Sequence, residues 1–317
     1  MASSDLDLRL RLVEIVYGAP GINLYRLASP DGATLPPFEP GAHLDLEIAP
    51  ALVRQYSLLW PQPAPDRYEI AVQEAPEGRG GSRGWHRQSV VGEIYRVSAP
   101  RNHFALGSQR EATHCLLAGG IGITPIIAMY RKLVAERRPV RLHYWTRGPE
   151  ATLFRNELAA VSDGSVHLHD TRGPAPRLAD ILADIPVQAP LYCCGPVRMI
   201  DAFDALTARR PPGLVHRERF AAAAVETGPT GGFTIRLARS GRTLDVSAEE
   251  SVLSTCLAAG IDLSYSCEEG VCGACEVRVL SGQVDHRDQV ITPAARQSAT
   301  TMMACCSRGL TTLELDI

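Results

Sequence analysis

The sequence predicts a chain of several domains: a β barrel, then an α/β domain with a parallel sheet, then a small domain made mainly of strands. Three observations predict this order. Residues 5–106 alternate apolar and polar side chains in short runs divided by Pro and Gly, from His114 apolar runs alternate with helical patterns, and strand patterning returns at residue 233. A length of 317 residues, 45% of them apolar and 21% charged, is enough for several folded cores.

The first segment has the pattern of antiparallel strands. The runs HLDLEIA (43–49), YEIAVQ (68–73) and EIYRVSA (93–99) have strand-like patterning and are separated by turn-forming residues. Such a series predicts an antiparallel barrel or sandwich. We assign residues 1–108 to this domain.

The second segment alternates strands with helices. HCLLAGG, PIIAMYRKLVAERR, VRLHYWT and LFRNELAAV follow one another, and the series ends at HRERF. This alternation predicts a doubly wound parallel sheet, which we assign to residues 109–222. Small and turn-forming residues follow, so we expect residues 223–232 to be a linker before the last domain, residues 233–317.

Composition narrows the classes of function. A net charge of −3 argues against a nucleic-acid partner. No apolar run of eighteen residues and no apolar signal core appear, so we expect a cytoplasmic protein without a membrane segment. Reduced thiols are the rule in that compartment, so the nine cysteines favour metal ligation over disulfides. Residues 233–317 hold 11 acidic residues against 7 arginines, a net charge of −4.

Clustered cysteines mark the last domain. The stretch CEEGVCGAC (267–275) has the spacing CxxxxCxxC, and 29 residues separate its last cysteine from the next one in MMACCSRG. This is the plant-type spacing for a 2Fe-2S cluster. Gly270 and Gly273 permit the loop conformations and the close backbone approach that such a cluster requires. The predicted cluster ligands are Cys267, Cys272, Cys275 and Cys305.

Two other interpretations of the cysteines stay open. A four-cysteine zinc site usually shows two CxxC pairs, whereas the first gap here is four residues. Buried thiols without a ligand are the other alternative. If Cys305 and Cys306 lie on a strand, their side chains point to opposite sides, and the spacing selects Cys305 as the ligand. Cys256, in the helical pattern 249–260, is expected to be a packing residue.

Residues 233–317 resemble the plant-type 2Fe-2S ferredoxins. The resemblance rests on the cysteine spacing and implies a β-grasp fold and the role of a one-electron carrier. Because a nicotinamide donates electrons in pairs, another group must divide the pair before the cluster can accept it.

The barrel segment contains two candidate sites for such a group. RQYSL (54–58) is a probable strand whose arginine could pair with a phosphate, whose tyrosine could cover a ring, and whose serine could reach a ring nitrogen. In GRGGS (78–82), consecutive backbone N–H groups could converge on an anion. Alone, each run also fits an edge strand or a solvated turn.

The parallel-sheet segment contains a candidate dinucleotide site. LLAGGIGITPI (116–126) passes from an apolar strand into a helix that we expect to start near Thr124 and Pro125. Its glycines would let a pyrophosphate approach the turn, and the helix N-terminus favours the negative charge. An ordinary strand-turn-helix is the alternative.

Together, RxYS, GRGGS, GGxGxTP and the CGP of YCCGP (192–196) resemble the ferredoxin reductase superfamily. The order of domains resembles the phthalate dioxygenase reductase and vanillate demethylase reductase family over the whole chain. The resemblance implies three residues at the reacting groups, namely Ser57, Cys194 and Phe220. A structural role is the alternative for Cys194, and Phe220 fits a core position equally well. It implies that the cofactor-binding residues are Arg54, Tyr56, Ser57, Gly80, Gly81, Ser82, Gly119, Gly120, Gly122, Thr124, Pro125, Thr146, Arg147, Cys194, Gly195, Pro196 and Phe220.

The resemblance also implies cofactors and partners. The family uses FMN, and the chain shows no long insertion after GRGGS for an adenosine group. One cation, Arg147, beside Glu150 favours NADH over NADPH. The implied function is a monomeric NADH-dependent reductase that passes electrons through FMN and a 2Fe-2S cluster to a separate Rieske oxygenase, docked transiently through charge, for hydroxylation or demethylation of an aromatic acid. A cytochrome P450 is an alternative recipient, quinone or oxygen another, and a colourless zinc-binding module is an alternative class.

Overall fold

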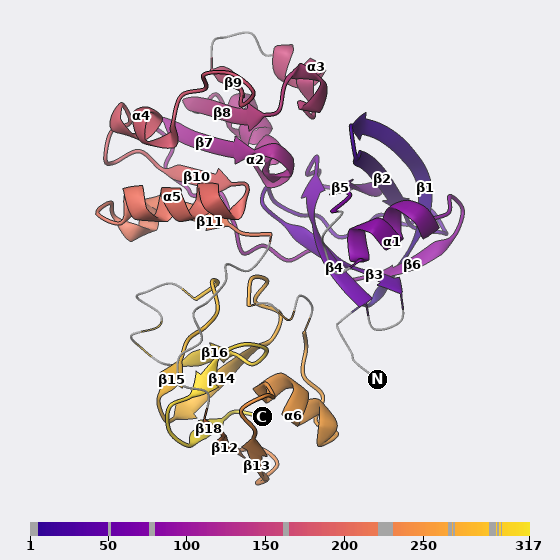
Figure 1. Ribbon diagram of the computed structural model, residues 1–317. Coiled ribbons are helices and arrows are strands. Elements are labelled where there is room, and N and C mark those ends of the chain that lie inside the picture. Colours follow the sequence, from indigo (N-terminus) through magenta and orange to yellow (C-terminus); the bar gives the residue numbers. More distant parts are fainter. Residues whose placement is uncertain are drawn as a thin grey trace. The chain divides into compact units, whose positions relative to one another are not determined.

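The computed structural model describes residues 6–49, 52–75, 80–160, 165–220, 231–265, 268, 270–291, 296, 298 and 300–317. Most of the predicted linker, residues 223–230, lies outside these ranges. The chain forms two compact units, Asp7–Phe220 and a second that contains Ala221–Ile317 (Figure 1).

The first unit begins with a closed antiparallel barrel in the strand order β1-β2-β5-β4-β3-β6. Its strands are β1 (Leu8–Ala19), β2 (Ile22–Ala28), β3 (His43–Ala49), β4 (Leu52–Leu59), β5 (Arg67–Gln73) and β6 (Ile94–Val97). Helix α1 (Gly81–Gln88) inserts Trp85 among the inward-facing side chains, where its ring lies 5.3 Å from that of Tyr25. Both rings are buried, so α1 forms part of the barrel core.

The rest of this unit is a parallel sheet in the order β11-β10-β7-β8-β9. Its strands are β7 (His114–Gly119), β8 (Val140–Thr146), β9 (Val166–Asp170), β10 (Leu191–Cys194) and β11 (Val215–Glu218). The helices are α2 (Ile123–Ala135), α3 (Arg155–Ala159), α4 (Leu178–Ala183) and α5 (Val197–Thr207), with short 3-10 turns η1 (Gly120–Gly122), η2 (Pro149–Ala151) and η3 (Pro212–Leu214). The chain starts at the central strand and winds outward first to one side, then to the other, which creates a switch point between β7 and β10.

Helices cover both faces of this sheet (Figure 1). Alternate residues of β7 pack with α2 on one face and with α4 and α5 on the other. Apolar residues of the barrel, including Leu59 and Ala71, belong to the same buried cluster as α2. Because η1 also contacts β5, the carboxyl end of β7 lies against the barrel.

The second unit is a mixed sheet in the order β13-β12-β18-β14-β16, with a separate pair of short strands, β15 and β17. The elements are β12 (Phe233–Leu237), β13 (Thr243–Val246), α6 (Val252–Ala258), β14 (Glu276–Ser281), β15 (Val284–Asp285), β16 (Thr301–Met303), β17 (Arg308–Gly309) and β18 (Leu313–Leu315). Helix α6 begins where Ser251 Oγ accepts the N–H of Ser254 at 3.0 Å. Cys256 of this helix is a core residue, as expected.

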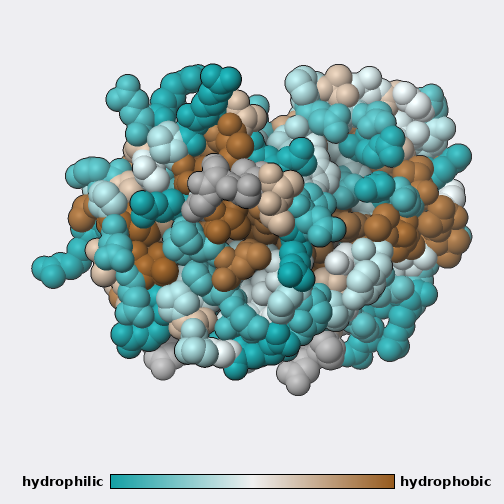
Figure 2. Space-filling model, turned by 90° about the horizontal axis from the view of Figure 1, so that it is seen from above, coloured by the Kyte–Doolittle hydropathy of each residue, from teal (hydrophilic) through white to brown (hydrophobic). Residues whose placement is uncertain are grey.

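Figure 2 shows a mainly hydrophilic face with hydrophobic patches between the polar side chains. Several exposed apolar residues lie on β1, on the turn that follows α1 and at the start of β6; they are Val13, Ile15, Tyr17, Val90, Val91 and Ile94. Within the part of the chain that the structure describes, no helix is both long and apolar enough to cross a membrane.

The predicted order of barrel, doubly wound parallel sheet and C-terminal β domain is confirmed. The condition attached to the cysteine pair is not met: Cys305 and Cys306 lie in a turn after β16 and not on a strand. The Met303 carbonyl accepts the N–H groups of both Cys306 and Ser307, which bends the chain away from β16. The alternation of side chains along a strand therefore does not apply to this pair. The predicted domain limits remain predictions.

Candidate functional site

The predicted phosphate-binding arginine lies at the start of α1. Arg54, on β4, extends its side chain across Gly81, where an added Cβ would lie 2.7 Å from Arg54 Nε. Gly80 has a φ of 87° and precedes α1 without a side-chain cap. The first N–H groups of α1 and the guanidinium therefore lie side by side, which is the environment that an anion such as a phosphate favours.

The described part of GRGGS, Gly80 to Ser82, is mostly helical. Helix α1 already begins at Gly81, so Ser82 is a helical residue. Its hydroxyl accepts the N–H of Ala75 at 3.0 Å and thereby holds the segment after β5. Gly80 and Gly81 thus provide the close backbone approach, while Ser82 has a structural contact of its own.

Two hydroxyls on β4 are buried without a partner. The Tyr56 hydroxyl and Ser57 Oγ make no hydrogen bond to any described residue. Buried polar groups are nearly always paired, so these two hydroxyls have capacity for a partner that the described residues do not supply. Burial also raises the pKa of Tyr56 above its usual value, which keeps the phenol neutral. The pair next to Arg54 fits a flavin, whose ring and phosphate would supply the missing contacts.

The two glycine motifs of the α/β domain meet at the switch point. A Cβ on Gly122 would overlap the Cys194 carbonyl, and a Cβ on Gly119 would lie 2.7 Å from Pro196 Cδ. The Cα of Gly119 lies 3.2 Å from the position that a Cβ of Gly195 would occupy. The backbones of both turns therefore approach as closely as glycine allows, at the carboxyl edge where such sheets bind dinucleotides.

Gly120 and the first turn of α2 complete this region. Gly120 has a φ of 54° and open space at its Cβ position, whereas Thr124 is buried and donates its hydroxyl to the Ile121 carbonyl at 3.0 Å. Helix α2 begins at Ile123, so Pro125 lies in its first turn, close to the expected start. The predicted dinucleotide residues thus share one turn, with Thr124 fixing its backbone.

Cys194 is fully buried, and sequence reasoning missed its neighbour. Cys194 pairs in register with Glu218 at the end of β11. Burial raises the pKa of the Glu218 carboxyl to about 8, and Glu218 Oε2 has no hydrogen-bond partner among the described residues. Burial, with Glu218 as a second cause, also raises the pKa of the Cys194 thiol well above its usual value. A thiol and a carboxyl whose neutral forms are favoured by burial therefore lie together beside the glycine turns. Phe220, which is 42% exposed, lies two residues beyond Glu218.

The loop after β8 contacts Arg172, a residue beyond the end of β9 that the sequence did not indicate. Thr146 Oγ1 donates to the Gly148 carbonyl at 3.2 Å, which shapes the loop around exposed Arg147. Arg172 packs on Gly148 and pairs with Glu150 at 2.5 Å and with Asp170 at 2.7 Å. The arginine thus has two carboxylate partners beside the predicted coenzyme loop.

The described part of the predicted cluster loop, residues 270–275, contains two buried cysteines and two glycines with positive φ. Cys272 and Cys275 are buried, Gly270 and Gly273 have φ values of 70° and 77°, and Cys272 Sγ accepts the N–H of Ala274 at 3.4 Å. Such N–H contacts to sulfur are typical of ligands in iron-sulfur sites.

The fourth predicted ligand belongs to a distant segment that returns to this loop. The N–H of Ala304 donates to the Cys275 carbonyl at 3.0 Å, which brings half-buried Cys305 next to the loop. Cys306 instead packs against Gly270, where its Sγ lies 2.5 Å from the position of an added Cβ. Cys267 lies outside the described residues. Among the His, Cys, Asp and Glu side chains that are described, no group of three or more has a metal-binding arrangement. Four thiols of this spacing are nevertheless the donor set that a 2Fe-2S cluster requires.

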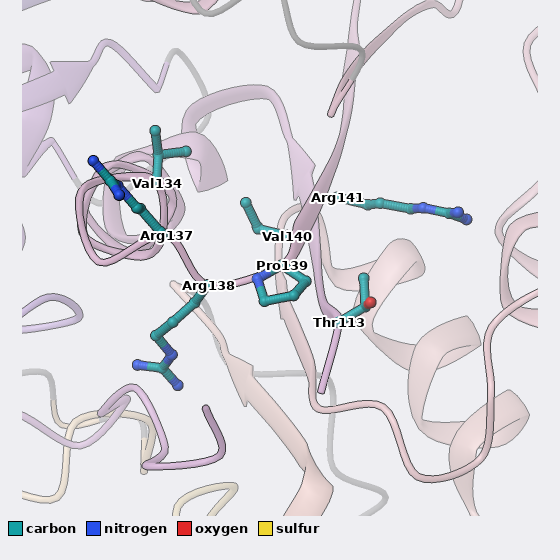
Figure 3. A pocket seen from close by; sticks show the side chains of 7 residues that line it. All are labelled: Thr113, Val134, Arg137, Arg138, Pro139, Val140 and Arg141. Carbon is teal, nitrogen blue, oxygen red and sulfur yellow. The ribbon is translucent and has the colours of Figure 1, made fainter. Parts of the chain in front are cut away.

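A cavity of about 510 Å³ lies at the amino ends of β7 and β8, whereas the glycine turns lie at the carboxyl ends of the strands. It is lined by Thr113, Val134, Arg137, Arg138, Pro139, Val140 and Arg141. Figure 3 shows that the side chains of its three arginines diverge, so they do not share one anion. Arg138 donates to the Gly107 and Gln109 carbonyls, both at 2.8 Å, and is thereby a structural residue.

Comparisons with known proteins agree with this organisation. A family model described as a 2Fe-2S iron-sulfur cluster binding domain matches residues 235–309. The phenoxybenzoate dioxygenase subunit beta of Ectopseudomonas oleovorans is 42% identical over all of this chain and 98% of its own length. The solved structure of phthalate dioxygenase reductase, described as modular for electron transfer from pyridine nucleotides to [2Fe-2S], is 37% identical, with a TM-score of 0.72 and full coverage of both chains. An intact type IV self-sufficient cytochrome P450 monooxygenase has a TM-score of 0.89 and 37% identity over 98% of this chain, which spans 41% of that longer chain.

The fold and the site define an oxidoreductase in which a flavin- and nicotinamide-binding fold is joined to a 2Fe-2S domain. Within that class, the chain belongs to the phthalate dioxygenase reductase and vanillate demethylase reductase family. The resemblance stated from the sequence is therefore confirmed over the whole chain, whereas the roles of individual residues remain predictions.

Gly270→Ala is expected to lower the iron content of the chain. The new Cβ would lie 2.5 Å from Cys306 Sγ and 3.0 Å from Asp288 Cα, and the φ of 70° adds strain of about 1–2 kcal/mol. Iron and sulfide per chain measure the effect. Gly260→Ala is the matched control, because its φ is 75° and no atom lies within 4 Å of its Cβ position. Equal iron loading in the two variants would contradict the prediction.

Glu218→Gln is expected to make stability less dependent on pH. The pKa of Glu218 is raised to about 8 from an ordinary 4.5, so the stability that its neutral form contributes is complete below pH 4.5 and is lost as the pH rises through about 8. Relative to the variant, the wild type should lose on the order of a few kcal/mol of unfolding free energy across this window.

Urea unfolding at several pH values, followed by tryptophan fluorescence, measures this difference. All three tryptophans, Trp60, Trp85 and Trp145, lie in the unit that contains Glu218. A difference between the two proteins that does not change with pH would contradict the prediction.

Proposed function

We propose that this chain oxidises NADH and passes the electrons through FMN and a 2Fe-2S cluster to a separate Rieske-type oxygenase. The observation that carries the proposal is the similarity over full length to a dioxygenase subunit and to a reductase described as transferring electrons from pyridine nucleotides to [2Fe-2S]. A flavin held by this barrel would supply the chemistry that divides a hydride's electron pair into single electrons, and this chemistry belongs to the cofactors. The chain's own residues bind and orient them.

FMN is the proposed flavin because the barrel provides a phosphate site and little beyond it. Arg54 and the start of α1 would hold the phosphate, and Ser57 would donate its unpaired hydroxyl to the flavin ring. After α1, only residues 89–93 precede β6, so no insertion follows that could hold the adenosine group of FAD. Tyr56 would contribute a neutral ring next to the flavin.

The turns that contain Gly119, Gly122 and Gly195 would hold the pyrophosphate and nicotinamide. Cys194 would contact the nicotinamide, and burial of Glu218 favours its uncharged form beside that contact. The exposed ring of Phe220 would exclude water from the reacting carbons.

NADH is the proposed coenzyme because the loop after β8 carries balanced charge. Two cations, Arg147 and Arg172, stand against the carboxylates of Glu150 and Asp170, and Arg172 pairs with both. A 2′-phosphate carries extra negative charge and favours a site with net positive charge, whereas a free ribose hydroxyl accepts carboxylate neighbours.

The proposed recipient binds the cluster domain. Its 11 acidic residues against 7 arginines favour a basic surface on the partner and an association that weakens with salt. A cytochrome P450 is the second candidate, because a self-sufficient P450 contains a region with the architecture of nearly this whole chain. We further propose that the reductase is a monomer that docks transiently.

The primary test is the visible spectrum of the purified chain before and after anaerobic addition of NADH, with flavin, iron and zinc quantified. The proposal expects one FMN and two irons per chain, with both chromophores bleached by NADH. Zinc without flavin would contradict it and favour a binding module.

Cys272→Ser is expected to lower the rate of NADH-driven cytochrome c reduction by about tenfold or more, because an electron cannot pass through the cluster. Ferricyanide reduction by the flavin is expected to stay at the wild-type rate. Steady-state assays with each acceptor in turn measure the two rates. Cys306→Ser is the matched control, because this thiol packs against Gly270 and is not a proposed ligand. Retained cytochrome c reduction in Cys272→Ser would mean that the cluster is not on the path and that the flavin serves another acceptor.

A chain with both Glu150→Gln and Asp170→Asn is expected to use NADPH about tenfold better relative to NADH, because removal of two negative charges favours the 2′-phosphate. The ratio of kcat/KM for the two coenzymes, with ferricyanide as acceptor, is the measurement. Asp184→Asn, at an exposed position after α4, serves as the control. An unchanged ratio would contradict the assignment of this loop.

A further inference from the structure

The proposed cluster ligands come from two segments that a third segment joins. The first segment is the described part of the CEEGVCGAC stretch, residues 270–275, and the second is the turn that contains Cys305. The third segment comprises β15 and the residues that follow it, 284–291. It contacts both of the others, so it can fix the distance between them.

The third segment contacts the loop at Gly270. The N–H of Gln289 donates to the Gly270 carbonyl at 2.8 Å. The Cα of Asp288 lies 3.0 Å from the position of a Gly270 Cβ, so the two backbones are in close contact.

The same segment contacts the turn of the fourth ligand. Asp285 pairs with Arg308 between β15 and β17. The N–H of Arg287 donates to Ser307 Oγ at 3.2 Å, two residues beyond Cys305. Residues 285–289 therefore lie between the two ligand-bearing segments and are hydrogen-bonded to each.

Asp288 is at the centre of these contacts, and its side chain is fully buried. Its Oδ1 accepts the N–H groups of Val290 at 3.0 Å and Ile291 at 2.7 Å. Its Oδ2 faces Ser307 Oγ and His286 Nδ1, each at 3.5 Å. One oxygen thus holds the third segment, while the other faces the turn of the fourth ligand.

Arg296 supplies the opposite charge. Its guanidinium donates to the Asp288 carbonyl and, at 3.1 Å, to the Ile291 carbonyl, and it lies 3.8 Å from Asp288 Oδ1. His286, the other titratable neighbour, is buried, and neither ring nitrogen has a hydrogen-bond partner among the described residues. A carboxylate in this position is costly to bury unless its contacts are kept, so the arrangement has little freedom to change.

We propose that Asp288 and Arg296 form a positioning pair that holds the two cluster-binding segments together and sets the reduction potential of the cluster. The inference rests on the proposed function, because it takes the cluster ligands from there. Asp288 is a positioning residue that acts through Gly270 and Ser307 and does not bind iron. Its charge and that of Arg296 act on the cluster with opposite sign, because net charge near a cluster shifts its potential.

Two variants distinguish an effect of charge on the reduction potential from an effect of weakened contacts between the segments. In Asp288→Asn the amide oxygen still accepts from Val290 and Ile291, while the negative charge is lost, so the midpoint potential is expected to rise. In Arg296→Gln the positive charge is lost, so the potential is expected to fall. A purely structural weakening would not move the two potentials in opposite directions.

The experiment uses the full-length holoprotein. The midpoint potential of the cluster comes from an anaerobic redox titration followed by electron paramagnetic resonance, and iron release to a chelator gives the retention of the cluster. Iron release from Asp288→Asn is expected to be about tenfold faster, because a buried carboxylate loses part of its contacts. Asp245→Asn is the matched control, since its carboxylate is exposed and accepts from Thr234.

Opposite shifts of potential with wild-type flavin reduction by NADH support the inference. If the wild type holds iron and sulfide, then unshifted potentials in both variants, or shifts of the same sign, overturn this inference and leave the proposed function standing. A wild-type chain that holds no iron and sulfide overturns the proposed function itself, and this inference with it.

Discussion

Close contact between two glycine turns at the switch point of the parallel sheet determines the arrangement of the first unit. Because the backbone of Gly122 meets the Cys194 carbonyl, β7 and β10 must end level with each other, and η1 is held against barrel strand β5. The barrel and the parallel sheet share one apolar cluster around α2 as a result. A side chain in either turn would separate the two strand ends and displace η1 from the barrel. The proposed flavin strand, β4, pairs with β5, so the same contact controls how the two proposed cofactor sites approach each other.

The second unit also depends on close backbone contact at a glycine, here between segments that carry the proposed cluster ligands. Its proposed ligands are far apart in sequence, so the loop needs a backbone contact to each neighbouring segment instead of a single rigid strand. Gly270 provides the space for Cys306 and Asp288, and the Ala304–Cys275 hydrogen bond aligns the last ligand. Burial of the Asp288 carboxylate costs free energy, and the contacts that it makes fix the separation of the two ligand-bearing segments.

Sequence periodicity was sufficient for the fold and for the motifs, because both are encoded in local spacing. Alternation along strands predicted the barrel, and the two glycine motifs were correctly expected at the ends of strands. Glu218, Arg172 and Asp288 were missed because each gains its importance from pairing between distant segments: β10 with β11, β8 with β9, and β15 with β17. Cys305 and Cys306 show the converse limit, since the alternation rule holds only while the backbone stays extended, and here it turns.

Among the described residues, no side chain or backbone group pairs with the buried hydroxyls of Tyr56 and Ser57, so a flavin bound there would supply their missing contacts. A bound flavin that pairs with these hydroxyls stabilises the folded state. Flavin binding is therefore linked to the folding equilibrium of the first unit, and its thermal midpoint depends on the concentration of free flavin. Flavin supply during synthesis would then affect how much of the chain survives proteolysis, in addition to how much of it is active.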